Sequence, residues 1–315
     1  GEENKGLACM FTMMNNARLA VGIQGLGVAE RAYQQALRYA LERRQGRAPG
    51  DRGEEMSPIA RHPDIKRMLL TMKSKTQVAR AICYACAHAI DMANVSEDEA
   101  GIVFWNDRAS LLTPIAKALS TDFGVEVASL GVQIHGGMGY IEETGAAQHL
   151  RDARIAPIYE GTNGIQSIDL VVRKLPLAGG DHIKGFIAEL KAIADDVAAS
   201  NRPEFGATAA RLGAGIQDLQ DATDYMLSAL AGGRMADALS GATPYLRVAG
   251  LTLGGALLAR GALRSSEDPA ERQAERTLLA RSFCETVLGE TAGLKSDVVL
   301  SADAITAFDP EALAS

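Results

Sequence analysis

The stretch LAVGIQGLGVAERAYQQALRYALE, residues 19–42, decides the fold class of this 315-residue chain. Large apolar residues recur along it at three- and four-residue steps and so share one face of a helix: Leu19, Ile23, Leu26, Tyr33, Leu37 and Leu41. Polar residues keep the same spacing on a different face: Arg31, Gln35, Arg38 and Glu42. The pattern predicts one long amphipathic helix over residues 8–44.

Helical periodicity continues along the chain, whereas the alternation typical of β-strands is hard to find. Glycines and prolines break it over residues 46–62, after which Pro63 opens a second helix. The further helices expected before residue 175 span 63–94, 104–134 with Pro114 as a candidate kink, a short segment after a loop at 136–145, and a segment ending near 174. Long helices with short connections predict an all-α fold, with a four-helix-type bundle in residues 1–175.

The best candidate for a domain boundary is the segment Leu175–Asp181, which combines a proline with two glycines. We expect a second helical domain over residues 176–315, and its sequence carries no recognisable chemistry. The helices expected there lie near 182–200, 205–231, 235–262 and 270–293.

Charge and composition exclude several classes of protein. The chain is 47% hydrophobic with a net charge of −7 and no block of Lys and Arg, so we expect no nucleic-acid partner. It has no uncharged apolar run of 18 residues, so we expect no membrane span. Four irregularly spaced cysteines indicate a reducing compartment, which predicts a cytoplasmic location. Cys83 and Cys86 near His88 are expected as buried helix cysteines, and no metal site is expected.

Two short motifs are candidates for chemistry: QIHGGMGY at residues 133–140 and IYEGTNG at residues 158–164. A carboxylate followed at once by glycine suits an active-site turn, since backbone there can approach a ligand closely. On these residues alone, Glu160 is either a general base or a solvated loop glutamate. The glycines near Gln133 are either a ligand-contacting turn or a plain helix end.

The order and spacing of these motifs, with RDARI at residues 151–155 and ERRQGR at residues 42–47, resemble the C-terminal half of an acyl-CoA dehydrogenase. The resemblance covers roughly residues 1–175. The chain departs from the usual Arg-x-x-Phe-Gly pattern, because Gly46 and Arg47 stand where phenylalanine and glycine are common. With the tail after residue 175, this is similar to the long bacterial branch, which includes enzymes acting on fatty-acyl-CoA and methylthio-propanoyl-CoA.

The resemblance implies a catalytic role for Glu160, which would take the α-proton of an acyl-CoA substrate while the β-hydrogen leaves as hydride to FAD. Arg18 resembles a residue near the thioester, although a helix-surface arginine is the alternative. Gly161 is implied beside the substrate. Thr162 and Gly164 match positions that contact FAD. Gly164 could contact it only through its backbone.

A second group of residues is implied to reach FAD from a neighbouring subunit: Arg43, Gln133, Gly136 and Gly137. Arg43 would meet the pyrophosphate, although a helix-end arginine is otherwise a favourable dipole partner. The resemblance therefore implies a homo-oligomer, with an electron-transferring flavoprotein as the electron acceptor.

Two alternatives stay open: a non-catalytic helical protein of the same ancestry, serving oligomerisation or partner binding, and an acyl-CoA oxidase. The start of the chain reads as the cut edge of a longer protein, preceded in the family by a β-domain. We therefore expect residues 1–315 alone to be inactive and to retain no FAD.

Overall fold

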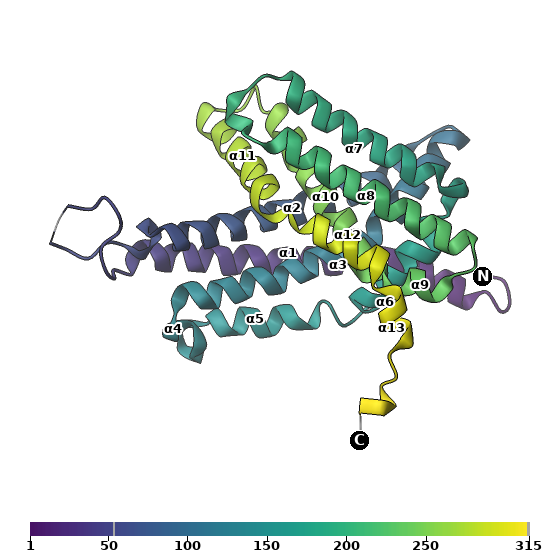
Figure 1. Ribbon diagram of the computed structural model, residues 1–315, viewed down its shortest axis with the longest axis horizontal. Helices are drawn as coiled ribbons and strands as arrows, with labels where there is room; N and C mark the ends of the chain where they lie inside the picture. The colour runs from purple at the N-terminus through teal and green to yellow at the C-terminus, as the bar shows by residue number, and fades with distance from the viewer. Residues whose placement is uncertain (53, 314–315) are drawn as a thin grey trace. The chain divides into compact units, whose positions relative to one another are not determined.

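The computed structural model describes residues 1–52 and 54–313, with the side chains of all but residues 8, 11, 12, 15 and 313. Apart from an isolated bridge between Arg44 and Pro58, every regular element in these residues is helical, which confirms the predicted all-α fold (Figure 1). The α-helices are α1 (Gly6–Glu42), α2 (Pro63–Val95), α3 (Glu99–His135), α4 (Gly137–Tyr140), α5 (Ala146–Ile155), α6 (Asn163–Asp169), α7 (Asp181–Ala199), α8 (Thr208–Ala231), α9 (Met235–Ser240), α10 (Ala242–Leu263), α11 (Ala270–Ser282), α12 (Glu290–Leu300) and α13 (Ala302–Ala307). Short turns of other helix types are η1 (Ile59–Arg61), η2 (Glu142–Thr144), η3 (Leu170–Lys174), η4 (Leu177–Gly180), η5 (Pro203–Phe205), η6 (Phe283–Val287) and η7 (Glu311–Leu313).

Helices α1 and α2 follow the predicted boundaries closely, but α3 begins at Glu99 rather than near residue 104. The reason is a cap: the Asp98 carboxylate accepts a 2.7 Å hydrogen bond from the Gly101 N–H. Pro114 lies inside α3, which continues beyond it to His135. The loop expected at residues 136–145 contains two short helical turns, α4 and η2.

The chain divides into two compact units. Unit 1 comprises Gly1–Tyr84 and Ala116–Glu160, and unit 2 comprises Ala85–Ile115 and Gly161–Ser315. The division passes through α2 and α3, so each of these helices contributes residues to both units. The domain boundary expected near residue 175 rests on the proline and glycines of the sequence, whereas the two units are defined by their compactness. That boundary stays a prediction.

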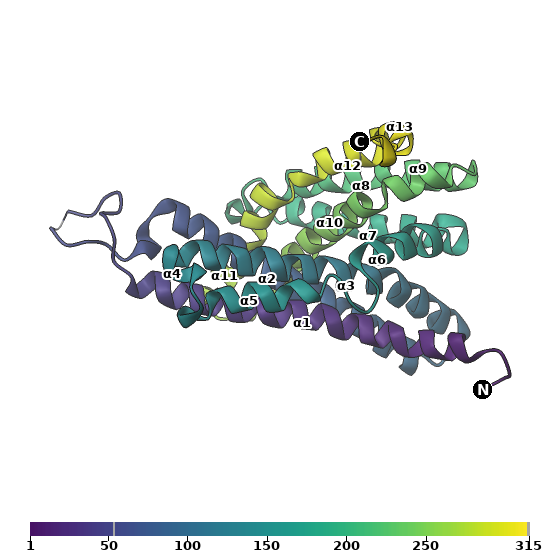
Figure 2. The same cartoon turned by 90° about the horizontal axis from the view of Figure 1, so that it is seen from below.

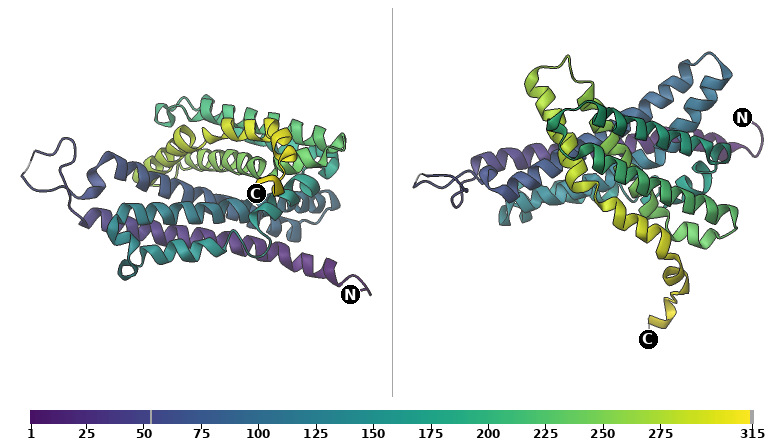
Figure 3. Two further views of the ribbon diagram at one scale, coloured as in Figure 1. Left: turned by 60° about the horizontal axis from the view of Figure 1, so that its bottom comes forward. Right: turned by 45° about the horizontal axis from the view of Figure 1, so that its top comes forward.

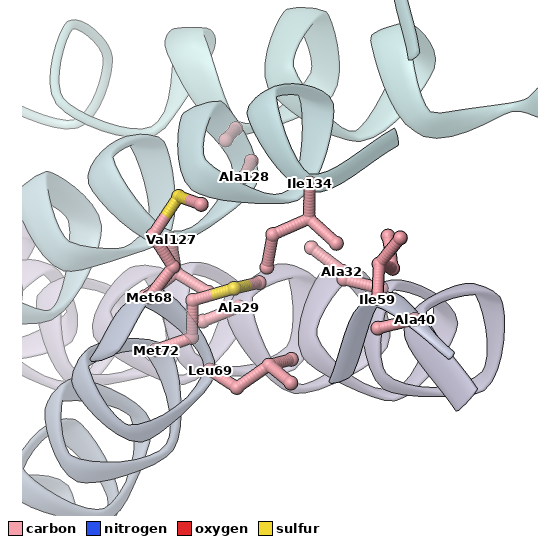
Figure 4. Close-up of a cluster of buried hydrophobic side chains, with 12 residues drawn as sticks. Ala29, Ala32, Ala40, Ile59, Met68, Leu69, Met72, Val127, Ala128 and Ile134 are labelled. Carbon is pink, nitrogen blue, oxygen red and sulfur yellow. The ribbon is translucent and has the colours of Figure 1, made fainter. Parts of the chain in front are cut away.

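The core of unit 1 corrects the predicted buried face of α1. Ala29, Ala32, Ala36 and Ala40 are buried among residues of α2 and α3 (Figure 4), whereas Ile23 and Leu41 are 46% and 57% exposed. Alanine has no bulk beyond Cβ, so helix backbones can approach closely along this face. The large apolar residues of α1 therefore mark only part of its buried surface.

Glycines bring α1 and α3 closest together. A Cβ atom at Gly22 would lie 2.7 Å from the Ala116 carbonyl oxygen, and one at Gly25 would lie 2.6 Å from the Ser120 carbonyl oxygen. A Cβ at Gly124 would in turn lie 2.9 Å from the Gly25 carbonyl oxygen. A side chain at any of these positions would collide with the backbone of the facing helix, so the close crossing of α1 and α3 depends on glycine.

The connection between α1 and α2 extends beyond the ends of both helices (Figure 3). Its two arms are joined by backbone hydrogen bonds: Gln45 N–H donates to Ser57 O at 3.0 Å, and Ile59 N–H donates to Arg43 O at 2.7 Å. These bonds fix the backbone of Arg43 where α1 ends.

Unit 2 is built around α10, which packs against α6, α7, α8, α11 and α12. Helix α10 is long and apolar enough to cross a membrane by composition alone, but 67% of its most apolar window is buried in the protein, as in a core helix. The sequence contains no uncharged apolar run of 18 residues here, because Arg247 and Arg260 interrupt the apolar residues of this helix. Arg108 lies in the first part of α3, which belongs to unit 2, and donates two hydrogen bonds to the Glu189 carboxylate of α7.

Two helices expected in unit 2 are interrupted. The segment 235–262 breaks at Gly241, because Pro244 has no N–H to donate to Ser240 in a continuous helix. The chain passes close to α8 there, since a Cβ at Gly241 would lie 2.7 Å from the Met226 methyl carbon. The segment 270–293 contains the π-helical turn η6, and α12 extends it to Leu300. Helix α13 was not anticipated.

Candidate active site

Helix α5 carries the chain back along α1 to the Glu160 turn, defined here as residues 158–164 (Figure 2). Near the start of α5, a 2.9 Å hydrogen bond joins His149 Nε2 to Gln35 Oε1 of α1. Beyond its end, the Tyr159 hydroxyl donates to the Gln24 amide oxygen, also of α1. The Glu160 turn is therefore anchored near the middle of α1.

The backbone of the turn is held in an unusual conformation. Glu160 has a φ of 54° and Gly161 a φ of 82°. The left-handed region is unfavourable for glutamate by on the order of 1 kcal/mol or more, so its surroundings must hold it there. The positive φ of Gly161 explains why glycine follows the carboxylate, and a Cβ there would also lie 2.9 Å from Gln166 Nε2.

Helix α6 begins directly after the turn. Thr162 is its N-cap, and its hydroxyl oxygen accepts a 3.2 Å hydrogen bond from Ile165 N–H. The buried Gln166 amide donates to the Gly161 carbonyl at 3.1 Å. Thr162 and Gly164 are exposed. No sequence motif pointed to Gln166, because its contact with Gly161 exists only in the folded turn.

Two cations of unit 1 are buried on neighbouring helices. Arg18 of α1 is only 7% exposed, which excludes the helix-surface alternative, and Lys117 of α3 is fully buried. Burial lowers the pKa of Lys117 to about 8; Asp122 and Glu160 oppose that shift, and Arg18 reinforces it. Arg18 and half-buried Glu160 thus both act on Lys117, whose only sequence signal was a lone lysine in an apolar helical stretch.

The other predicted residues of unit 1 gather where α1 ends. Arg43 N–H donates to the Tyr39 carbonyl, and the Tyr39 ring stacks on His135, the last residue of α3, at 4.4 Å. Gln133, Gly136 and Gly137 surround that histidine in sequence, and all three are exposed, as is Arg43. A Cβ at either glycine would meet no atom within 4 Å. We call this group the Arg43 end: Arg43, Gln133, Gly136 and Gly137.

The Arg43 end lies far along α1 from Arg18. Arg18 and Arg43 lie 25 residues apart, which corresponds to roughly 38 Å of helix. The structure therefore separates the predicted site residues of unit 1 into two groups, one near Glu160 and one at the Arg43 end.

His135, Cys83 and Cys86 are buried in helices and make hydrogen bonds within the protein. His135 is buried and its Nδ1 lies 2.6 Å from the Gly131 carbonyl oxygen, as expected of an ordinary hydrogen-bonded histidine. Cys83 and Cys86 are buried in α2, with Cys83 Sγ 3.5 Å from Ser120 Oγ, which confirms their expected place. Within residues 1–52 and 54–313, no cluster of three or more His, Cys, Asp or Glu side chains is placed to hold a metal ion.

Comparison with known proteins bears on the whole chain. A family model described as "Acyl-CoA dehydrogenase, C-terminal domain" matches residues 4–175, and one described as "Acetyl-CoA dehydrogenase C-terminal like" matches residues 183–309. The chain is 40% identical to a 3-methylmercaptopropionyl-CoA dehydrogenase from Ruegeria pomeroyi, over 97% of this chain and 52% of that protein. It is 36% identical to a butyryl-CoA dehydrogenase from Syntrophomonas wolfei, over 64% of this chain and 33% of that protein.

A solved structure shares the fold. The crystal structure of an acyl-CoA dehydrogenase complexed with FAD from Bacillus anthracis superposes with a TM-score of 0.73 at 20% identity, covering 100% of this chain and 52% of that one. The chain thus spans about half the length, or less, of these relatives. Because the first family model alone matches more than half of its residues, the chain belongs to the acyl-CoA dehydrogenase family.

Proposed function

We propose that this chain forms the helical part of an FAD-dependent acyl-CoA dehydrogenase, which introduces an α,β double bond into an acyl-CoA thioester. The observation that carries the proposal is the Glu160 turn, in which a half-buried carboxylate is held in a left-handed backbone conformation and acts on the charge of buried Lys117. A scaffold protein gains nothing from such an arrangement, whereas a general base must be held in a fixed position.

The proposed chemistry assigns one role to each part of the turn. The Glu160 carboxylate takes the α-proton, and the electrons of that C–H bond form the new double bond. FAD, when bound, would supply the acceptor for the β-hydrogen and its electron pair. The Glu160 backbone N–H donates to the thioester carbonyl, where negative charge develops. Gly161 leaves one side of the carboxylate open to substrate, and Arg18 lies near the thioester.

The residues that would hold FAD fall into two sets. Thr162 and Gly164 follow Glu160 in the chain and would contact the cofactor of the same subunit. The Arg43 end would reach the cofactor of another subunit, because roughly 38 Å of helix separates it from Arg18. Its exposed guanidinium suits a pyrophosphate, and its open glycine backbone leaves room for a large planar group. We therefore propose a homo-oligomer in which two copies complete each site.

The relatives support a short-chain substrate. The proteins from Ruegeria pomeroyi and Syntrophomonas wolfei are named for thioesters with short acyl groups, 3-methylmercaptopropionyl-CoA and butyryl-CoA. We propose a substrate of this class, with an electron-transferring flavoprotein as the acceptor. A cytoplasmic location remains our prediction from the cysteine pattern.

Turnover by the full-length protein tests this proposal. The protein is purified with FAD, given 3-methylmercaptopropionyl-CoA, butyryl-CoA or a long-chain acyl-CoA, and assayed for the enoyl-CoA product by mass spectrometry. We expect product with a short acyl-CoA, dependent on added electron-transferring flavoprotein. Peroxide release in air without that carrier would identify an oxidase, and the absence of product with every thioester would indicate a non-catalytic relative.

A further inference from the structure

Gln166 is a buried polar side chain that the proposed chemistry does not use. It lies on α6, six residues after Glu160, and is 0% exposed. Its amide nitrogen donates a 3.1 Å hydrogen bond to the Gly161 carbonyl, whereas its amide oxygen has no hydrogen-bond partner among the residues that the structure describes. A buried acceptor without a partner costs stability, and an apolar side chain of the same size would avoid that cost. Stability alone therefore does not explain a glutamine at this position.

The direction of the Gln166 amide follows from its partner. The Gly161 carbonyl can only accept a hydrogen bond, so the NH2 group of the side chain and not its oxygen must face Gly161. A Cβ at Gly161 would lie 2.9 Å from Gln166 Nε2. Gln166 thus lies directly against the residue that follows the Glu160 carboxylate, on the side where any other residue would carry its side chain.

The first turn of α6 holds Gln166 in this place. The Gln166 N–H donates to the Thr162 carbonyl at 3.0 Å, and the Thr162 hydroxyl oxygen accepts from Ile165 N–H at 3.2 Å. Side chains of an α-helix lean toward its N-terminus. The Gln166 side chain therefore reaches back over the start of α6 to Gly161, and all of these contacts lie within unit 2.

The contact restrains a strained part of the backbone. Glu160 has a φ of 54° and Gly161 a φ of 82°, and a glutamate keeps such a conformation only where its surroundings hold it. Gly161 is bonded directly to Glu160 and, as a glycine, has a wide choice of backbone angles. A hydrogen bond to its carbonyl removes that choice and so fixes the backbone immediately after the carboxylate.

We propose that Gln166 is a positioning residue for the base: its amide group fixes the Gly161 carbonyl and thereby holds the Glu160 turn in the conformation that serves catalysis. The inference rests on the proposed role of Glu160 as the base. Gln166 need not touch substrate or flavin, because it acts through the backbone of Gly161. The groups that it positions are the Glu160 carboxylate and the Glu160 N–H, both of which act on charge that develops in the transition state.

The experiment measures anaerobic flavin reduction in the full-length holoenzyme at increasing concentrations of a short acyl-CoA. Gln166→Met removes the amide and keeps a similar side-chain length, and Gln166→Asn keeps the amide but shortens its reach by one methylene. The matched control is Thr223→Val, because Thr223 on α8 is also fully buried in unit 2 and would lose a 2.8 Å hydrogen bond to the Tyr245 hydroxyl. Rates are expressed per bound flavin, so unfolded protein does not contribute.

We expect the limiting rate of flavin reduction to fall by about 10–100-fold in both Gln166 variants, as when a catalytic group is misplaced by about 1 Å. The half-saturating acyl-CoA concentration and the flavin content should stay unchanged, because the lost interactions are made in the transition state. Thr223→Val should keep the wild-type rate even where its Tm falls.

A wild-type limiting rate in either Gln166 variant would overturn the inference and leave the dehydrogenase function intact. A rise in the half-saturating concentration at an unchanged limiting rate would also overturn it, because Gln166 would then contribute to substrate binding alone. If neither variant folds, a crystal structure of the wild-type holoenzyme with bound acyl-CoA decides, and a separation of Gln166 Nε2 from the Gly161 carbonyl oxygen beyond about 3.5 Å would contradict the proposal. A wild-type flavin that no acyl-CoA reduces would remove the proposed function and the role of Gln166 together.

Discussion

Substituting Gly25 tests whether the close crossing of α1 and α3 organises unit 1. In Gly25→Ala, the new Cβ would lie 2.6 Å from Ser120 O, 2.7 Å from Thr121 Cα and 2.9 Å from Ser120 C. All three are backbone atoms, so no side-chain rotation can relieve the contact, and ordinary van der Waals separation begins at 3.4 Å. The helices must move apart by nearly 1 Å, and overpacking of this kind costs about 1–3 kcal/mol.

Gly27→Ala is the matched control, because Gly27 lies on the same helix and a Cβ there meets nothing within 4 Å. Both variants gain about 1 kcal/mol of helix propensity, so their difference isolates the steric cost. We expect Gly25→Ala to be less stable than Gly27→Ala by about 1–3 kcal/mol, which corresponds to several degrees in Tm. Thermal unfolding followed by circular dichroism at 222 nm measures this difference. Equal Tm values for the two variants would refute the reasoning.

Three further outcomes follow from the site. The Lys117 pKa is lowered to about 8 from an unfolded value of 10.5, so the folded state binds fewer protons between these pH values. The stability of the wild type should therefore rise relative to Lys117→Met from pH 8 to pH 10, by on the order of 2 kcal/mol, as measured by denaturant unfolding. Arg43→Ala should weaken FAD retention by the full-length protein about tenfold or more, because a charge-assisted contact is lost, and should leave the helix content unchanged. The control Arg52→Ala should retain FAD like the wild type. Gel filtration followed by flavin absorbance measures the FAD content of both variants. Residues 1–315 alone, mixed with excess FAD and desalted, should be colourless, and a yellow protein with stoichiometric flavin would contradict this.

Helical periodicity was enough to predict the long helices, because α1 and α2 carry apolar residues at helical spacing over more than thirty residues each. It was not enough to predict which face of α1 is buried. Large residues dominate a periodicity argument, whereas the closest contacts of α1 are made by Gly22, Gly25 and four alanines. The break at Gly241 was missed although Gly241 and Pro244 are local helix-breaking residues, since Pro244 cannot donate a backbone hydrogen bond to Ser240.

The candidate site was predictable to the extent that its residues form local motifs. Glu160 and the glycines after Gln133 were found from consecutive residues. Their separation in space follows from helix length, and the rise per residue would have indicated it. Lys117 was missed because a lone lysine in an apolar helical stretch can be buried or can extend to the surface. Its relation to Glu160 arises only where the chain returns along α5.

The most direct test of the account is anaerobic flavin reduction by a short acyl-CoA in full-length Glu160→Gln. The amide keeps the size of the side chain but cannot accept the α-proton. We expect flavin to stay bound while its bleaching slows by about 10²–10⁴-fold or more, the usual cost of losing a general base. Glu97→Gln, at an exposed glutamate between α2 and α3, should bleach like the wild type. Bleaching by Glu160→Gln within a few-fold of the wild-type rate would contradict the central claim that Glu160 is the base.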